Sequence, residues 1–194
     1  ALPISPEKDR EKQKRDAYWK VIVPRWPTSA DGKWYWKCDT SSDELDGHYF
    51  FYAQYYDLVA ETEEEKARVR EHVRALTDHL VEHNFCLVDH DGKPTRWAQF
   101  NPEALNGDPN WYVERGLNSL SILSYLAVAE HMTGDPKYRQ ASDKLIREHH
   151  YAQNTLVPKI HTGIGSGNQS DDEMAFMNYY NILKYEKDPK LHAI

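Results

Sequence analysis

A short acidic sequence occurs twice in the chain, each time directly ahead of a stretch rich in aromatic residues. Residues 41–44 read Ser-Ser-Asp-Glu and residues 170–173 read Ser-Asp-Asp-Glu, and both copies follow a long polar stretch. This pattern is typical of a helix N-terminus, where serine and glutamate side chains bind the free backbone N–H groups. Because a repeated junction between loop and helix indicates repeated helical units, we expect several copies of one helical unit.

The apolar residues form two kinds of helical pattern. The first is apolar or aromatic on nearly every side and predicts buried inner helices, over residues 43–60, 108–133 and 171–186. The second has one apolar stripe on a charged surface, over a helix that begins at Thr62 and over residues 135–150. One-sided stripes predict outer helices, and a third outer helix is expected from residues 188–189 (Asp-Pro). Residues 1–20 predict a polar N-terminal helix with Ser5 as its N-cap.

The connections between these helices differ in length. Turns from an inner to an outer helix are short, near Glu61, Gly134 and Lys187. Connections from an outer to an inner helix run to roughly twenty residues, well above the usual handful. All long loops should therefore lie at one end of the molecule, beside the N-termini of the inner helices. Residues 85–98 within one of them predict a β-hairpin that turns near 91–92 (Asp-Gly).

Composition narrows the class of protein. The chain has 194 residues, of which 40% are hydrophobic, and this predicts a single globular domain with a real core. Its formal net charge of -7 argues against nucleic acid as a partner, and no apolar run is long enough to predict a membrane span. Cys38 and Cys86 either form one disulfide or stay as free thiols. The sequence does not fix the cellular location of the protein, and it slightly favours a secreted or periplasmic one.

Residues 36–44 and 47–50, 92–97 and 114–119, together with the tight Gly-Asp-Pro turn, resemble the (α/α) toroids of six-hairpin glycosidases. Incomplete toroids of bacterial polysaccharide lyases are similar. The resemblance extends over about residues 30–190 and implies an all-α fold of antiparallel helical hairpins, with a small β-hairpin in a rim loop. It implies a carbohydrate as the substrate. A full toroid has six hairpins, so the chain is expected to be part of a larger ring, completed by missing C-terminal sequence or by a second copy of the chain.

The carboxylates at the two junctions suggest two different roles. Glu44 and Glu173 fit the last position of a capping box and are explained by structure alone. Asp43 and Asp172 are not needed by that motif. They either place favourable charge in the first helical turn or face each other across a cleft as an acid and base pair. We expect hydrolysis of a poly- or oligosaccharide with Asp43 and Asp172 as the catalytic carboxylates.

Elimination from a uronate-containing glycan is the alternative reaction. His48 is either a hydrogen-bonded core residue or a proton-transfer group in that reaction. Arg115, beside Glu114, either pairs with a neighbouring helix or binds a uronate carboxylate, and Arg96 is a second candidate for that task. Glu44 and His48 supply only two metal ligands, so we expect no metal centre and no cofactor.

Four tryptophans are expected on or near the rim, Trp34, Trp36, Trp97 and Trp111. Each is either buried under the loops or free to stack on a sugar ring, and their number favours a stacking surface. A non-catalytic explanation also fits these residues, namely a helical-repeat module that binds a glycan or a protein through its aromatic rim.

Overall fold

The computed structural model describes residues 4–16, 19–161, 163–165, 167–189 and 191 of the chain. Most of these residues are helical, and the helices are α1 (Pro6–Arg15), α2 (Ser42–Gln54), α3 (Glu63–Glu82), α4 (Arg115–Thr133), α5 (Pro136–His149), α6 (Tyr151–Asn154) and α7 (Gln169–Tyr185). A two-stranded antiparallel sheet pairs β1 (Cys86–Val88) with β2 (Pro94–Gln99). The prediction of a helical protein with a small β-hairpin is therefore confirmed.

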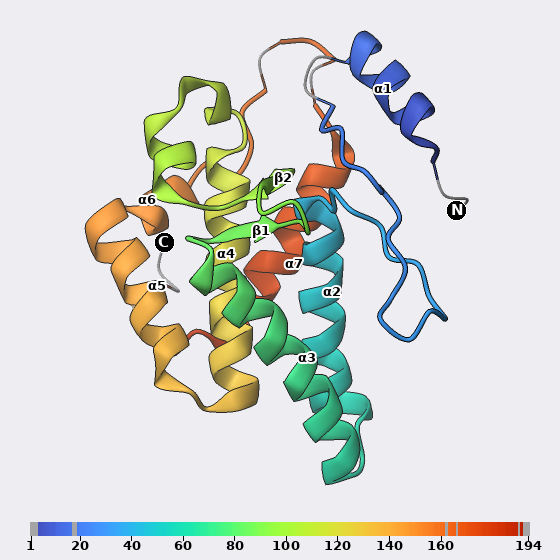
Figure 1. Ribbon diagram of the computed structural model, residues 1–194. Helices are drawn as coiled ribbons and strands as arrows, with labels where there is room; N and C mark the ends of the chain where they lie inside the picture. Colours follow the sequence, from blue (N-terminus) through green and yellow to red (C-terminus); the bar gives the residue numbers. More distant parts are fainter. Residues whose placement is uncertain (1–3, 17–18, 162, 166, 190, 192–194) are drawn as a thin grey trace.

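The division into inner and outer helices is also visible in the packing. Nearly every residue of α4 is buried, and α4 lies between α5 on one side and α3 on the other (Figure 1). In α3 the buried residues form a single stripe, Val69, Val73, Thr77 and Leu80. A helix with one buried stripe can be covered on one face only, so α3 is an outer helix as expected.

The three inner helices α2, α4 and α7 all touch one another. The amide nitrogen of Asn178 in α7 lies 2.8 Å from Oδ1 of Asp46 in α2 and 3.2 Å from the hydroxyl of Ser121 in α4. In an arc of a ring, the first and third inner helices would be separated by the second. The triangle seen here brings them into direct contact instead, and it places buried polar groups where all three helices meet.

The turns and loops are arranged as their lengths predict. Figure 1 shows the short α2–α3 and α4–α5 turns at one end and the long connections at the other. Gly134 ends α4 with φ of 68°, a left-handed conformation that glycine adopts without strain, and Asp135 immediately caps α5. Because every inner helix begins at the other end, their N-termini gather beneath the long loops. We call that end of the molecule the rim.

Several boundaries differ from the sequence prediction. The N-terminal helix ends at Arg15 and does not extend to residue 20. The sequence at Asp108 opens a 3-10 turn, Pro109–Trp111, and α4 begins later, at Arg115. Inside the third long loop the structure adds the short helix α6, which the sequence pattern did not predict. The third outer helix expected after residue 188 falls largely outside the described residues. Both cysteines, Cys38 and Cys86, are free and buried.

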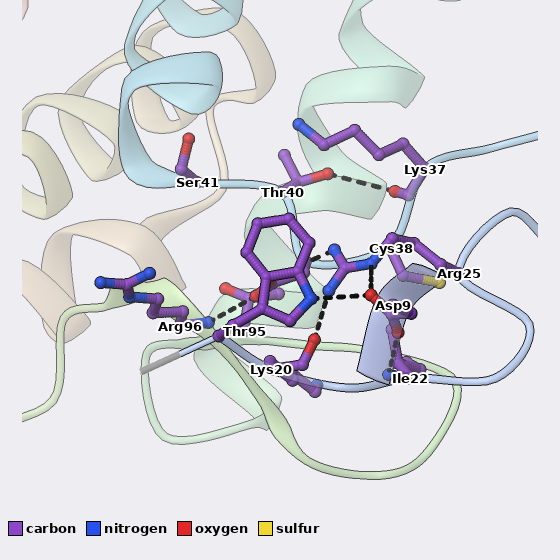
Figure 2. A network of polar contacts seen from close by, with 12 residues as sticks. Asp9, Lys20, Ile22, Arg25, Lys37, Cys38, Thr40, Ser41, Thr95 and Arg96 are labelled. Atoms are coloured by element: carbon purple, nitrogen blue, oxygen red, sulfur yellow. Dashed lines mark hydrogen bonds and ion pairs between the residues drawn. The ribbon is translucent and has the colours of Figure 1, made fainter. Parts of the chain in front are cut away.

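The N-terminal segment is anchored to the rim by buried charges. Asp9 of α1 and Arg25 are almost completely buried, and Nε of Arg25 lies 2.7 Å from Oδ1 of Asp9. Arg25 also reaches Oδ2 of Asp39 at 3.5 Å, ahead of α2, and the N–H of Arg96 in β2 donates to the same carboxylate (Figure 2). Burial alone would raise the pKa of Asp9, but hydrogen bonds from Trp19, the Ile22 N–H and Arg25 lower it. The segment is thus part of the folded domain.

Candidate functional site

Two adjoining pockets open at the rim, where the inner helices begin. The first, of about 350 Å³, lies between the starts of α2, α4 and α7, and we call it the acidic pocket. The second, of about 380 Å³, is lined by Arg96 and Trp97 of β2 and by residues 110, 111, 113 and 114, and we call it the aromatic pocket. Trp97 and Glu114 line both pockets, so the two adjoin, and we name them together the rim cleft.

Lys159 lies between two carboxylates of the acidic pocket. Its Nζ is 2.9 Å from Oε1 of Glu114 and 2.9 Å from Oδ2 of Asp171. Only 11% of the Lys159 side chain is exposed, so solvent screens these ion pairs weakly. Burial alone would lower the pKa of Lys159, but its hydrogen bonds to both carboxylates outweigh that effect and raise the pKa. The lysine is therefore a fixed cation at neutral pH.

Asp43 lines the same pocket from the first turn of α2. Its Oδ1 accepts hydrogen bonds from the Ser41 hydroxyl and from the Glu44 N–H. The nearby Lys37 forms an ion pair with Glu44, at 2.8 Å, and not with Asp43. The Glu44 carboxylate also accepts the Ser41 N–H at 3.0 Å, which is the capping role that the sequence assigns to it. Asp43 is thus a carboxylate in the cleft that has no ion pair among the described residues.

The second acidic junction differs from the first in register. Asn168 is the N-cap of α7 and accepts a hydrogen bond from the Ser170 N–H, so the capping box expected over residues 170–173 does not form. The helix begins two residues earlier than the pattern suggests. Asp171 faces the acidic pocket and is buried, while Asp172, the residue that the sequence selects, is exposed and does not line it.

The aromatic pocket collects four of the residues that the sequence selects for substrate binding. Arg96, Trp97, Trp111 and Glu114 all line it. The two indole rings meet edge to face with centroids 6.3 Å apart, and the Arg96 guanidinium lies over the Trp97 ring at 4.3 Å. Trp97 is 41% exposed, so a large part of its ring is free to contact a ligand.

Besides Asp172, three predicted site residues lie outside the rim cleft. His48 is exposed on α2 and stacks on the ring of Tyr52, with centroids 5.5 Å apart. Trp36 packs edge to face on His90 at 5.9 Å. Nε of Arg115 donates to the backbone carbonyl of Leu105 at 2.8 Å, which fixes the start of α4 to the preceding loop. These side chains have packing roles and line neither pocket.

Sequence reasoning missed Lys159 and Asp171. Asp171 carries a usable signal, because Asn168 is itself a strong N-cap residue and would set the register of α7 two residues earlier. Lys159 carries none, since a single lysine in a polar loop is an ordinary surface residue. Only its contacts across the rim, with Glu114 ahead of α4 and Asp171 in α7, place it between two acids.

Known proteins give no further guide to the site. The chain matches no family model, no curated protein and no solved structure. Among the described residues, no group of three or more His, Cys, Asp or Glu side chains is placed to hold a metal ion. No helix in the described ranges combines the length and apolarity that a membrane span needs.

Proposed function

We propose that the rim cleft binds a carbohydrate and hydrolyses a glycosidic bond. The observation that carries the proposal is that the acidic pocket adjoins the aromatic pocket, with Trp97 and Glu114 lining both. An aromatic surface suits the apolar face of a sugar ring, and carboxylates within reach of the same ligand suit its hydroxyl groups and its glycosidic oxygen. Cleft, aromatic rings and acids together form the arrangement that a saccharide requires.

The carboxylates of the acidic pocket differ in a way that fits the two roles in this reaction. Glycoside hydrolysis uses one carboxyl group that carries a proton and one carboxylate that is ionised. We assign Asp171, which Lys159 holds at 2.9 Å, the part of the carboxylate that activates water or attacks the sugar. Asp43 lines the same pocket without an ion pair among the described residues, and we assign it the donation of a proton to the leaving oxygen.

The alternatives differ in how well the site supports them. Elimination from a uronate would use His48 as the base and Arg115 or Arg96 to bind the uronate. His48 and Arg115 lie outside the rim cleft and Arg96 lines it, so this reaction keeps a cation at the site but not its base. A glycan-binding module without catalysis is favoured by one observation. Glu114 and Asp171 are both held by Lys159, and side chains held in this way are suited to accept hydrogen bonds from a ligand without changing protonation.

The resemblance to (α/α) toroids remains part of the proposal. The alternation of inner and outer helices with all long loops on one rim supports it, and the contact between α2 and α7 departs from it. A second copy of the chain as a partner is also a proposal. It is supported by the face of α7, where Phe176, Tyr180 and Leu183 are 73%, 46% and 62% exposed. Light scattering on the purified protein tests this, and a monomer at all concentrations would contradict it.

A polysaccharide panel tests the proposed reaction. Each substrate is incubated with the protein, and both new reducing ends and the absorbance of unsaturated products are recorded. We expect reducing ends without unsaturated products, and we expect Asp43→Asn and Asp171→Asn each to reduce the rate at least a hundredfold. Asp172→Asn is the matched control and should keep the rate of the unaltered protein.

The outcomes separate the alternatives. Unsaturated products would show elimination. Saccharide binding in a calorimeter without any cleavage would show a binding module. If no saccharide in the panel either binds or is cleaved, carbohydrate is the wrong ligand class.

A further inference from the structure

A layer of buried polar side chains lies directly below the acidic pocket. Ser42 and Met174 line that pocket, and one helical turn further along their helices stand Asp46 and Asn178. Both side chains are 0% exposed. They are joined by Ser121 and Tyr125 of α4, so the layer takes one or more residues from each inner helix. A change in the hydrogen bonds of this layer would therefore shift the first turns of α2 and α7, which carry Asp43 and Asp171.

The two carboxylate oxygens of Asp46 have different surroundings. Oδ1 accepts hydrogen bonds from the Tyr125 hydroxyl and from the Asn178 amide nitrogen, the latter at 2.8 Å. Oδ2 is buried and has no hydrogen-bond partner among the described residues. An ionised carboxylate would leave part of its charge on a buried oxygen without a well-formed hydrogen bond among the described residues, and that is costly.

Asn178 has a matching oxygen. Its amide nitrogen also donates to the carbonyl of Met174 at 3.0 Å, and a carbonyl can only accept, so the orientation of the amide is fixed. The other end of that amide, Oδ1, is buried and unpartnered within the described residues. Asp46 and Asn178 are therefore already joined by one hydrogen bond, and each has one unused oxygen.

No cation balances Asp46 in the described part of the chain. The groups that reach it are Tyr125 and Ser121 from α4 and Asn178 from α7, and on its own helix Asp43 is the nearest charge. From α3, the hydroxyl of Thr77 is hydrogen-bonded at 2.8 Å to the hydroxyl of Tyr49, which lies about one turn after Asp46 on α2. Burial raises the pKa of Asp46 to about 7, its three hydrogen-bond donors oppose that rise, and the negative charge of Asp43 adds to it.

We propose that Asp46 is protonated in the folded protein and donates from Oδ2 to Oδ1 of Asn178. The two side chains then form a carboxylic acid–amide pair with a hydrogen bond in each direction, and this pair holds α7 to α2 beneath the rim cleft. The proton satisfies both unused oxygens at once. Loss of the proton removes one hydrogen bond and leaves a buried charge between the two helices. Asp46 is thus a positioning residue that makes the cleft sensitive to pH.

The effect of pH follows from proton linkage. The folded protein binds this proton more tightly than the unfolded chain, where the reference pKa is 3.8, so stability falls as pH rises between about 4 and 7. From pH 5 to pH 7 this group alone lowers the folding equilibrium constant by about fiftyfold. Above pH 8 it contributes no further change.

Asp46→Asn is the decisive variant. An asparagine presents an acceptor and a donor in nearly the places of the protonated acid, so it retains both hydrogen bonds to Asn178 and cannot ionise. We expect it to fold, and we expect the ratio of its folding constant to that of the unaltered protein to rise about fiftyfold from pH 5 to pH 7. Asp143→Asn, on the partly exposed surface of α5, is the control and should show a constant ratio.

Two measurements on the unaltered protein need no variant. The side-chain carboxyl of Asp46 is followed by carbon NMR from pH 3 to pH 9, and we expect it to titrate near 7. Hydrogen exchange of the α7 amides over residues 174–182 should become faster above that pH in the unaltered protein and not in Asp46→Asn.

Titration of Asp46 below pH 5 would overturn the proposal and show an ionised carboxylate. A constant stability ratio between the two proteins would overturn it as well. Neither experiment uses a saccharide, so their failure is independent of the proposed function.

Discussion

Two acidic regions one helical turn apart use the same residue type in opposite ways. In the acidic pocket, Asp171 faces a lysine at 2.9 Å and is balanced by its charge. In the layer below, Asp46 has amide and hydroxyl partners but no cation among the described residues. The sequence shows an ordinary aspartate in both places. Partners and burial, and not the residue type, decide which carboxyl group forms an ion pair and which one has its pKa raised, as burial does for Asp46.

Removing Asn178, the hydrogen-bond partner of Asp46, should lower the free energy of unfolding more than any other change proposed here. Asn178→Ala leaves the carboxyl group without the amide and opens a small cavity, and we expect a loss of about 3 kcal/mol in the free energy of unfolding. Asn181→Ala is the matched control, because Asn181 is equally buried on α7 but donates only to Ser124, at 3.1 Å. It should cost about 1 kcal/mol. Urea denaturation at pH 6 measures both, and equal losses would contradict the special role of Asn178.

Removing Lys159, the cation of the acidic pocket, should lower the free energy of unfolding by an intermediate amount. Lys159→Met leaves Glu114 and Asp171 close together without a positive charge, and we expect a loss of about 2 kcal/mol at pH 7. Lys137→Met is the comparison on the surface, where Lys137 lies 2.7 Å from Asp78 with 43% of its side chain exposed. That change should cost less than about 1 kcal/mol. A thermal or urea transition measures both, and a loss as small as that of Lys137→Met would show that the Lys159 contacts add little.

The smallest expected effect is a loss of saccharide affinity when a tryptophan of the aromatic pocket is removed. Trp97→Ala should weaken binding of a saccharide by about tenfold, close to 1 kcal/mol, because one stacking face is lost. Trp36→Ala removes a comparably exposed indole that lies outside both pockets, and it should leave the affinity unchanged. Isothermal calorimetry with a saccharide that the panel identifies measures both variants. Equal losses would mean that the cleft is not where the ligand stacks.

The architecture could be predicted from the sequence because it depends on local signals. Apolar periodicity distinguishes α3 from α2, and loop lengths place all long connections on the rim. The capping pattern at Ser41 also gave the correct helix start. At α7 the same kind of pattern was misleading, because the serine of the repeated sequence competes with Asn168, two residues upstream, for the N-cap.

The candidate site could be predicted only in part. Trp97, Trp111 and Glu114 were found because aromatic residues and acids beside helix starts are a local signal. The contact of Lys159 with Glu114 joins residues 45 positions apart in the chain, and the pair of Asp46 and Asn178 joins residues 132 positions apart. Such contacts depend on how three helices close into a triangle, and nothing in the local sequence around Asp46 indicates its partners.

The anchored N-terminal segment limits how the chain can be shortened. Arg25 is buried with Asp9 as its nearest carboxylate, and Ile22 gives its backbone N–H to the same side chain at 3.0 Å. A protein trimmed to begin after α1 would keep the arginine and lose that anion, so the buried cation would retain only the more distant Asp39, at 3.5 Å, and the loss is destabilising. The first helix is polar and rich in charge, so its sequence alone would make it an obvious segment to delete. A shortened form that retains the rim should therefore either keep residue 9 or replace Arg25 as well.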